Sequence, residues 1–501
     1  MIKRILIASW IASVIVISFN EILFAHSFSE RYKSPVDISF VILFIFLLMG
    51  LLFLVNQSGF YANHKLIHDA KYNILQVRMV RKFLINNILL NSMKLISISI
   101  LILLTITSFL GSQNPAANLS PTFIWVIWWT GIGLISAFLG NVWILLNPWK
   151  AIYEWTEIAL GRKHDHRDTG IWDYPKILDV WPAVILILVL GWLENVFAGS
   201  AKPLFLGFTI LIYSFVTWAG MIAFGKTIWL KNFDPICIAF ELLSCFAILE
   251  FRENTKTTNF PSSIEYKVKK SIFLRPLCVG LTNLKKPSYA MMVFITAFSS
   301  NIIYAAILEV PLWLSIKAYW IGVIHDMTGV SVYSAVPGYL IDFLGMLLFW
   351  RMVFALYSGA IHAMKFFSGT KLPSLELKLR LIWILIPFTI FVNFAHGFAF
   401  FLVDAQMIIP LISDPFGFGW DLFGTANFTK DLLIFNAKGA FLILVISIII
   451  GGSCSAFVSN TIINQMIDSK RAFILTKLPL FIFFLTFMAF SILLISQPML
   501  L

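Results

Sequence analysis

Ten apolar segments, each long enough to cross a bilayer, constrain the fold of this chain more than any other feature. A transmembrane helix needs about 20 mostly apolar residues. The segments cover residues 37–56, 94–111, 122–146, 181–199, 204–225, 289–308, 338–358, 381–403, 439–458 and 478–497. Only 12% of the residues are charged, about half the ~25% of soluble domains. We therefore expect an all-α fold, a polytopic membrane helical bundle of about ten transmembrane helices, and we exclude soluble, fibrous and disordered classes.

The first 25 residues have the layout of a secretory signal peptide. Lys3 and Arg4 precede an apolar run at residues 5–19, and the small residue Ala25 follows. Cleavage there would leave His26 at the start of the mature chain. Leu23 is large for a position two residues before the cleavage site, so an uncleaved anchor helix is the alternative. Residues 26–501 are expected to form a single transmembrane domain.

The distribution of Lys and Arg predicts the orientation of the spans, because cytoplasmic loops are enriched in both. Thirty of the 37 Lys and Arg residues fall in segments on one side and six on the other, while Arg351 lies within a span. The mature N-terminus and the C-terminus are then periplasmic. Residues 233–251 are predicted to be an inner amphipathic or re-entrant helix, and residues 252–288 a basic cytoplasmic loop. The positive charge is explained by topology and anionic lipid, without nucleic acid.

Ionisable residues within the spans gather near the predicted outer face. Glu194, Asp342 and His396 lie about 4 to 7 residues from the outer ends of their spans, or ~6–10 Å below the surface at 1.5 Å per residue. Charged groups in a membrane are costly and default to functional candidates. The outer segments add further histidines and carboxylates: His26, His325, Asp326, Asp404, Asp414 and Asp421. We therefore predict a polar site that opens to the periplasm.

Two kinds of role are assigned to these residues. The predicted metal ligands are His26, Glu194, His396, Asp404 and His325, and the predicted catalytic residues are Asp414, Asp421 and Asp326. Imidazole and carboxylate donors suit a divalent transition metal such as zinc or copper, and a free N-terminal His26 would add its amine. The alternatives are a buried His396 bonded to a neighbouring carbonyl, a hydrogen-bonded Glu194 that joins helices, and solvated loops for the rest.

Three other features of the sequence combine polar, charged or aromatic side chains. The pair His64 and His68 and the histidine-rich residues 161–168 are predicted on the cytoplasmic side, where a solvated structural role is favoured. Arg351 needs a partner or water within the membrane. Residues 413–427 combine glycines with aromatic side chains and are predicted to form tight turns at the lipid interface, placed to cover an outer pocket.

Several motifs resemble a family of bacterial polytopic membrane proteins commonly labelled fenitrothion hydrolase. They are AHSFSER at 25–31, ANLSPTF at 117–123, GNVWILLNPWKAIYEW at 140–155, WLENVF at 192–197 and SDPFGFGWDLFGTAN at 413–427. The resemblance runs in order over nearly the whole chain. It implies a bacterial inner-membrane protein, with some members taken to hydrolyse lipophilic organophosphate triesters. The positions that match are His26, Arg31, Asn147, Pro148, Trp149, Glu194, His396, Gln406, Asp414, Gly419, Trp420 and Asp421.

Three positions depart from the family pattern. Members tend to carry Gln where this chain has Asp404. They also tend to carry an Asp near the outer end of the sixth span, which this chain lacks around Asn301, and a histidine about where this chain has Ser453. If that histidine binds a metal or acts as a base in the family, we expect this chain to lack the family's enzymatic activity.

Three functions remain open on the sequence. The first is metal-dependent hydrolysis of lipophilic esters or phosphoesters that enter from the outer leaflet. The second is a transporter or metal-handling permease, which requires polar groups through the full membrane thickness. The third is a non-catalytic subunit of a homo- or hetero-oligomeric assembly. The first explains best why the ionisable groups lie on one side.

Overall fold

The structure is a computed structural model, and it describes residues 37–57, 71–161, 170–255, 268–308, 310–431, 437–466 and 470–495. Several predictions fall on other residues. The signal or anchor segment, His26, the pair His64 and His68, and residues 162–169 lie outside the described part of the chain.

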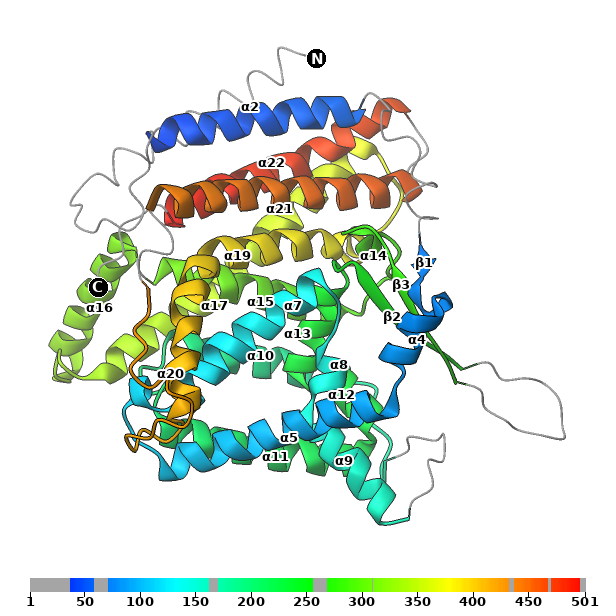
Figure 1. Cartoon of the computed structure of the whole chain (residues 1–501). Helices are drawn as coiled ribbons and strands as arrows, with labels where there is room; N and C mark the ends of the chain where they lie inside the picture. Colours follow the sequence, from blue (N-terminus) through cyan, green and yellow to red (C-terminus); the bar gives the residue numbers. More distant parts are fainter. Residues whose placement is uncertain are drawn as a thin grey trace, which may run out of the picture.

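The elements follow one another as helices with three short strands (Figure 1). The first half holds α2 (Ile38–Gln57), β1 (Tyr72–Asn73), η2 (Ile74–Gln76), α4 (Arg78–Leu84), α5 (Asn87–Leu110), η3 (Pro115–Ala117), α6 (Leu119–Pro121), η4 (Thr122–Ile132), α7 (Gly133–Phe138), α8 (Trp143–Leu146), α9 (Pro148–Ala159), α10 (Trp181–Asn195), α11 (Pro203–Phe224), α12 (Lys226–Asn232), α13 (Pro235–Ser244) and β2 (Leu249–Thr255). The second half holds β3 (Val268–Leu274), α14 (Val279–Thr282), α15 (Tyr289–Ile307), α16 (Pro311–Thr328), α17 (Ala335–Ser368), α18 (Ser374–Leu381), η5 (Ile382–Ile384), α19 (Leu385–Asp404), η6 (Ala405–Met407), α20 (Ile408–Ser413), α21 (Ala437–Met466) and α22 (Lys470–Ile495).

The all-α membrane class predicted from the sequence is confirmed. Each of the ten predicted segments contains helix, and eight helices in the described residues are long and apolar enough to span a membrane. Helices α2 and α10 are among the shorter apolar ones. Only helices and closed barrels satisfy every backbone polar group within a bilayer, which is why apolar runs of this length become helices.

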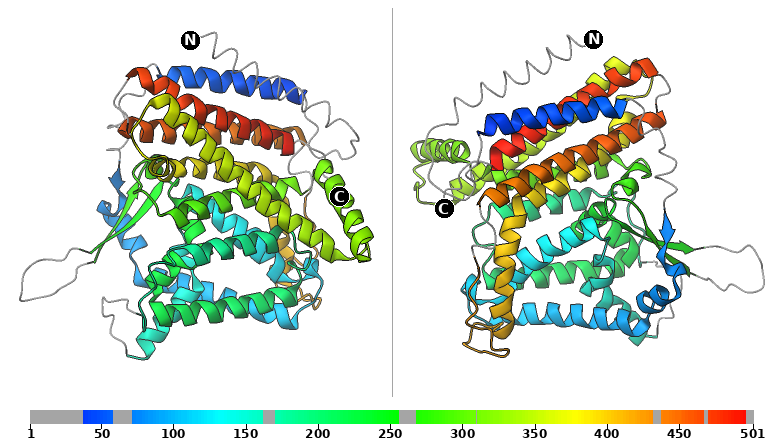
Figure 2. Two further views of the ribbon diagram at one scale, coloured as in Figure 1. Left: turned by 180° about the vertical axis from the view of Figure 1, so that it is seen from behind. Right: turned by 45° about the horizontal axis from the view of Figure 1, so that its top comes forward.

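The long helices pack in layers, and α15 lies inside the bundle. Helix α15 packs on α10, α17 and α19, while α21 and α22 lie on the other side of α17 and α19, with α2 outermost (Figures 1 and 2). Helices α5 and α11 form a further layer on the opposite side of the molecule. Tyr304 of α15 and Tyr357 of α17 are almost fully buried in the core. Phe40 and Leu47 of α2 are each 66% exposed, as expected of side chains in contact with lipid.

The predicted third span differs from the single run of residues 122–146. It begins at Leu119 and ends at Phe138, and residues Thr122–Ile132 form a π-helix of 11 residues. At Gly140 the chain turns with a φ of +143°, which glycine adopts readily because it lacks a Cβ. The carbonyls of Phe138 and Leu139 have hydrogen-bond partners despite the turn, because they accept the two backbone N–H groups at the start of β2, at 3.1 and 3.0 Å.

The segment predicted as an amphipathic or re-entrant helix over residues 233–251 is helical over a shorter range, Pro235–Ser244. Helix α13 ends at Ser244, and most of its side chains are buried against α7, α10 and α12. Asp234 caps its start, because its Oδ1 accepts the N–H groups of Ile236 and Cys237 at 2.9 and 3.1 Å. The chain then enters β2, which pairs antiparallel with β3 in a sheet of order β1-β3-β2. Part of the predicted loop 252–288 is therefore a β-ladder.

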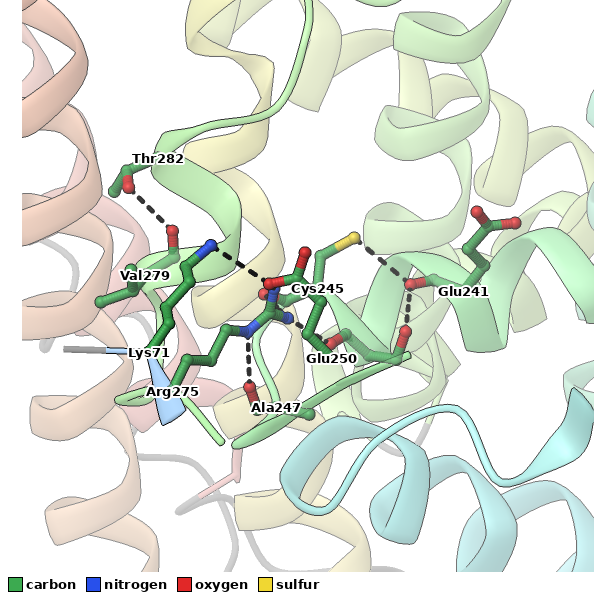
Figure 3. Close-up of polar contacts among 9 residues, drawn as sticks. Lys71, Glu241, Cys245, Ala247, Glu250, Arg275, Val279 and Thr282 are labelled. Carbon is green, nitrogen blue, oxygen red and sulfur yellow. Dashed lines mark hydrogen bonds and ion pairs between the residues drawn. The ribbon is translucent and has the colours of Figure 1, made fainter. Parts of the chain in front are cut away.

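Arg275 ties this sheet to the end of α13 (Figure 3). Its guanidinium donates to the carbonyls of Ser244, Cys245 and Ala247 at 3.0, 3.0 and 3.1 Å, and to Glu250 Oε2 at 2.9 Å. Lys71 reaches the same carboxylate at 3.2 Å. A basic side chain at a helix C-terminus satisfies carbonyls that have no partner within the helix. Arg275 is 7% exposed, so its charge is buried, and four hydrogen bonds satisfy most of its five N–H donors.

Candidate functional site

Three segments at the predicted outer ends of spans meet at one end of the bundle, which we call the loop end: residues 111–119, 196–204 and 413–428. The backbone N–H of Ser112 donates to the carbonyl of Phe416 at 2.7 Å, and that of Leu119 to Pro415 at 3.2 Å. The backbone N–H of Leu204 donates to the Oε1 of Gln113 at 3.0 Å. The opposite end, with the β-ladder, is called the hairpin end. The three segments therefore share one end of the bundle, and the periplasmic orientation of this end stays a prediction.

The loop of residues 413–428 is built from the tight turns that its glycines predict. Gly417, Gly419 and Gly424 have φ values of +71°, +83° and +75°. The rings of Phe416, Phe418 and Trp420 pack together with centroid separations of 5.2 to 5.5 Å. The aromatic cluster lies over turns that only glycine adopts without strain.

Asp414, a predicted catalytic residue, holds one of these turns. Its Oδ1 accepts the backbone N–H of Phe418 at 3.0 Å, and its Oδ2 that of Gly419 at 2.7 Å. Both carboxylate oxygens therefore bind the loop itself. The geometry gives Asp414 a structural role, and its catalytic role stays a prediction.

Asp421, the second predicted catalytic residue of the loop, holds the next turn. Its Oδ1 accepts the backbone N–H of Ala426 at 3.0 Å and the hydroxyl of Ser413 at 2.8 Å. These hydrogen bonds, that from Ala426 first, lower the pKa of Asp421 below its usual value because they stabilise the carboxylate. Asp421 thus fastens both ends of the loop as an ionised group.

Asp404, a predicted metal ligand, lies at the last position of α19 and binds a cation of the protein. Its Oδ1 is 2.8 Å from the Nζ of Lys430. Nearby, Gln406 pairs with the backbone of Asp431 in both directions, at 2.9 and 3.2 Å. These contacts anchor the chain that returns from the loop to α21.

Glu194, predicted as a metal ligand, lies in the last turn of α10. Its Oε1 accepts the indole N–H of Trp129 at 2.8 Å, and the carboxylate is exposed. Trp129 belongs to the π-helix η4. Long π-helices are rare, and π segments occur frequently at functional sites. The sequence drew attention to Glu194 but gave no signal for its tryptophan partner.

His396, also a predicted ligand, lies in α19, which packs against η4. A Cβ on Gly131 of η4 would come within 3.2 Å of the Phe401 ring of α19. The Nδ1 atom of His396 is buried and has no hydrogen-bond partner among the described residues. The expected alternative, a ring nitrogen bonded to a neighbouring carbonyl, is therefore not seen at Nδ1. A buried polar atom of this kind calls for a ligand or water.

His325 and Asp326 lie in the last turn of α16, a helix that the sequence did not predict. Both are exposed, and His325 Nδ1 is 2.9 Å from the carbonyl of Val330. Helix α16 is held by Asp342 of α17, which is 3% exposed. Its carboxylate binds the ammonium of Lys317 and accepts the indole N–H of Trp313 at 2.9 Å. Asp342 is thus accounted for by helix packing.

The described residues contain no group of three or more His, Cys, Asp or Glu side chains close enough to hold a metal ion. Glu194 and His396 lie on two different helices, and His26 lies outside the described residues. Catalytic zinc sites use three protein ligands. The predicted zinc or copper site therefore stays a prediction that depends on His26.

Two features were missed because sequence hydropathy does not report them. One is a cluster of indole rings around η4, in which the indole N–H groups of Trp128 and Trp143 are buried and find no partner among the described residues. The other is Lys477, which precedes the predicted tenth span but is 3% exposed within α22. Arg351, predicted to need a partner, is exposed on α17 and lies 5.8 Å from the Phe354 ring.

Comparison of the chain with protein-family models, with curated proteins and with solved structures finds no match. The hydrolase resemblance therefore stays an expectation drawn from sequence motifs.

Proposed function

We propose that this multi-pass membrane protein hydrolyses lipophilic esters or phosphoesters at a site beside η4, near the loop end. In this proposal the protein resides in a bacterial inner membrane with the loop end toward the periplasm. The substrate enters from the outer leaflet, where an apolar ester concentrates.

The observation that carries the proposal is that η4 binds Glu194 of α10 and also packs against α19, the helix that carries His396. Trp129 of η4 binds Glu194 of α10 at 2.8 Å, and Gly131 of η4 faces α19, the helix of His396. Glu194 is exposed, while the Nδ1 of His396 is buried without a partner in the described residues. Such groups are costly within apolar helices, so their presence there favours a functional role.

The chemistry follows from the two side chains. The Glu194 carboxylate accepts a proton from water as the water oxygen bonds to the carbonyl carbon or phosphorus. The ester C–O or P–O bond then breaks, and the proton passes from Glu194 to the oxygen of the leaving alcohol, or to solvent when a phenolate leaves. The Trp129 N–H fixes the orientation of the carboxylate. His396 supplies the hydrogen bond that its free Nδ1 can make to a polar atom of the substrate. Asp414 and Asp421 keep the aromatic loop in place over this end.

The metal-dependent form of the proposal needs at least one donor besides Glu194 and His396. Glu194 and His396 give two donors from two helices, and His26 would be the third. No step above is routed through a metal. Metal analysis of the purified protein together with determination of its first residue tests this form, and zinc or copper with a free His26 amine would support it.

The decisive experiment measures release of 4-nitrophenolate from the full chain in lipid nanodiscs. The substrates are 4-nitrophenyl esters of increasing acyl length and diethyl 4-nitrophenyl phosphate. We expect Glu194→Gln and His396→Asn each to lower kcat/KM by about 10²-fold or more, the range of general acid–base catalysis. Matched controls are Glu241→Gln, an exposed acid of α13, and His362→Asn, an exposed histidine of α17. No turnover by the native chain, or equal loss in variants and controls, would refute the proposal.

A further inference from the structure

Helix α4 (Arg78–Leu84) lies at the hairpin end beside the β-ladder (Figure 1). It follows η2, in which Leu75 is 6% exposed, and strand β1, which pairs with β3. The chain is fixed just before β1 as well, since Lys71 binds Glu250 at 3.2 Å. None of the side chains of α4 is buried. The helix is therefore an anchored but uncovered part of the protein surface.

Helix α4 does not extend into the hydrocarbon core with α5. Since α5 ends at Leu110, next to the loop end, it starts at the hairpin end. Its 24 residues extend about 36 Å and cross a core of about 30 Å without α4. Ile85 and Asn86 interrupt the helix, and Asn86 is extended, with a ψ of 118°. The Oδ1 of Asn86 caps α5 by accepting the N–H of Ile88 at 2.8 Å. Helix α4 is therefore placed at the membrane surface.

The side chains of α4 form three faces at about 100° per residue. Val80 and Leu84 are partly buried, which places the first face against the protein. Met79 and Phe83 lie about 40° apart on the second face, and they are 83% and 64% exposed. The third face is basic and exposed, and it consists of Arg78, Arg81 and Lys82. An apolar and a basic face side by side are typical of a helix that lies in a membrane interface.

Among the described residues, no hydrogen bond or ion pair satisfies the three basic side chains. A guanidinium can bind two oxygens of one phosphate, and three positive charges together attract an anionic leaflet more strongly than one. Water would solvate these charges, but it would leave the apolar side chains of Met79 and Phe83 exposed at a cost in free energy. Acyl chains at the leaflet boundary cover both. A lipid surface therefore fits the basic and the apolar face of α4, whereas an acidic soluble partner fits only the basic one.

We infer that α4 is an interfacial helix that binds the anionic phospholipids of the leaflet at the hairpin end. Its three basic side chains bind headgroup phosphates, while Met79 and Phe83 lie among the first methylene groups of the acyl chains. Long Lys and Arg side chains reach the headgroups while their apolar stems cover hydrocarbon. This surface lies at the other end of the bundle from Glu194 and does not depend on the proposed hydrolysis.

Hydrogen exchange of residues 78–84 in lipid nanodiscs tests the inference on the full chain. One set of discs holds dioleoyl phosphatidylcholine alone, and the other holds equal parts of it and dioleoyl phosphatidylglycerol. We expect these amides to exchange about tenfold more slowly in the anionic discs. The basic triple variant, Arg78→Gln with Arg81→Gln and Lys82→Gln, should abolish this difference, although Gln favours a helix about as well as Arg and Lys. The matched control should keep the difference, and it removes three exposed lysines of other loops: Lys176→Gln, Lys285→Gln and Lys371→Gln.

Two further variants and one anion test each face of α4. Arg78→Lys with Arg81→Lys keeps the charge and should keep the difference between the two kinds of disc. Met79→Gln with Phe83→Gln removes the apolar face and should speed exchange in both. Inorganic phosphate added to phosphatidylcholine discs should give no comparable slowing, and an equal slowing would overturn the inference in favour of a site for free anions. The inference is also overturned if the native chain exchanges equally in both kinds of disc, or if the lysine control loses the difference as fully as the basic triple variant.

Discussion

The indole of Trp129 donates a hydrogen bond of 2.8 Å to the carboxylate of Glu194, and this bond joins the π-helix η4 to α10. The two residues are 65 positions apart in the chain. In the proposed reaction Trp129 is a positioning residue, because it acts through Glu194.

Trp129→Phe keeps an aromatic ring but removes this hydrogen bond. A bond to a charged group contributes about 1.5–3 kcal/mol, so we expect kcat to fall about tenfold or more while KM changes little. Ester hydrolysis at several substrate concentrations measures both constants. Trp125→Phe is the matched control. Trp125 lies in the same π-helix, and the substitution removes its indole hydrogen bond to the carbonyl of Ser200. A change in KM alone for Trp129→Phe would contradict the positioning role.

Asp421 predicts a pH dependence of the loop. The bonds from Ala426 and Ser413 lower its pKa in the folded chain. Their stabilisation is therefore fully present above the unfolded pKa of about 3.9 and is lost as the pH falls through the lower folded pKa. Hydrogen exchange of residues 413–428, corrected for intrinsic rates, should rise in that acidic range. Asp421→Asn should exchange faster at neutral pH with a flatter pH profile, and an unchanged profile would disprove the assignment.

Arg275 predicts a large loss of stability on truncation. Its guanidinium binds three carbonyls and Glu250, and a Cβ on Gly280 would come within 2.3 Å of its Cζ atom. Removing one partner of a buried ion pair costs about 3–5 kcal/mol. We expect Arg275→Ala to lower the Tm strongly in detergent and Arg275→Lys to lower it by an intermediate amount. If both variants unfold with the native Tm, the guanidinium does not hold α13 and β2 together.

The transmembrane helices could be predicted because the bilayer forces long apolar runs into helices. The glycine turns at Gly417, Gly419 and Gly424 could be predicted for a local reason as well, since their conformation is set by one residue. The π-helix η4 could not, because no residue pattern distinguishes its bonding from that of an α-helix. The buried position of α13 and its Arg275 cap depend on packing against distant elements, which hydropathy does not record.

The candidate site was predictable to a lesser degree. Glu194 and His396 were found because ionisable side chains are rare in apolar segments. The role of an ionisable side chain depends on partners that are distant in the sequence. Asp404 pairs with Lys430, 26 residues away, and Asp342 pairs with Lys317, 25 residues away. A carboxylate that looks reactive in the sequence can therefore be an ion-pair partner or, as for Asp414, a turn former.

The ion pair between Lys317 and Asp342 predicts how α16 is attached. Lys317→Met leaves the nearly buried carboxylate with the Trp313 indole as its hydrogen-bond partner, and the loss should approach about 3 kcal/mol. We expect faster hydrogen exchange in residues 311–328 with little change in α15. Replacing both partners, as Lys317→Met with Asp342→Leu, should recover part of the stability because no buried charge is left unpaired. Equal exchange in α16 and α15 after Lys317→Met would mean that the pair does not attach α16.

Gly191 sets how closely α10 approaches α15. A Cβ at this position would lie 2.3 Å from Nδ2 of Asn301, whose amide donates to the carbonyl of Ile187 at 3.0 Å. Gly191→Ala must therefore displace Asn301 from that bond, and such overpacking costs about 1–3 kcal/mol. Gly359→Ala on α17 is the matched control, because nothing lies within 4 Å of its Cβ and alanine favours the helix by up to about 1 kcal/mol. Thermal unfolding in detergent should show a lower Tm for Gly191→Ala and an unchanged or higher Tm for Gly359→Ala. Equal shifts would mean that α10 and α15 are not in close contact at Gly191.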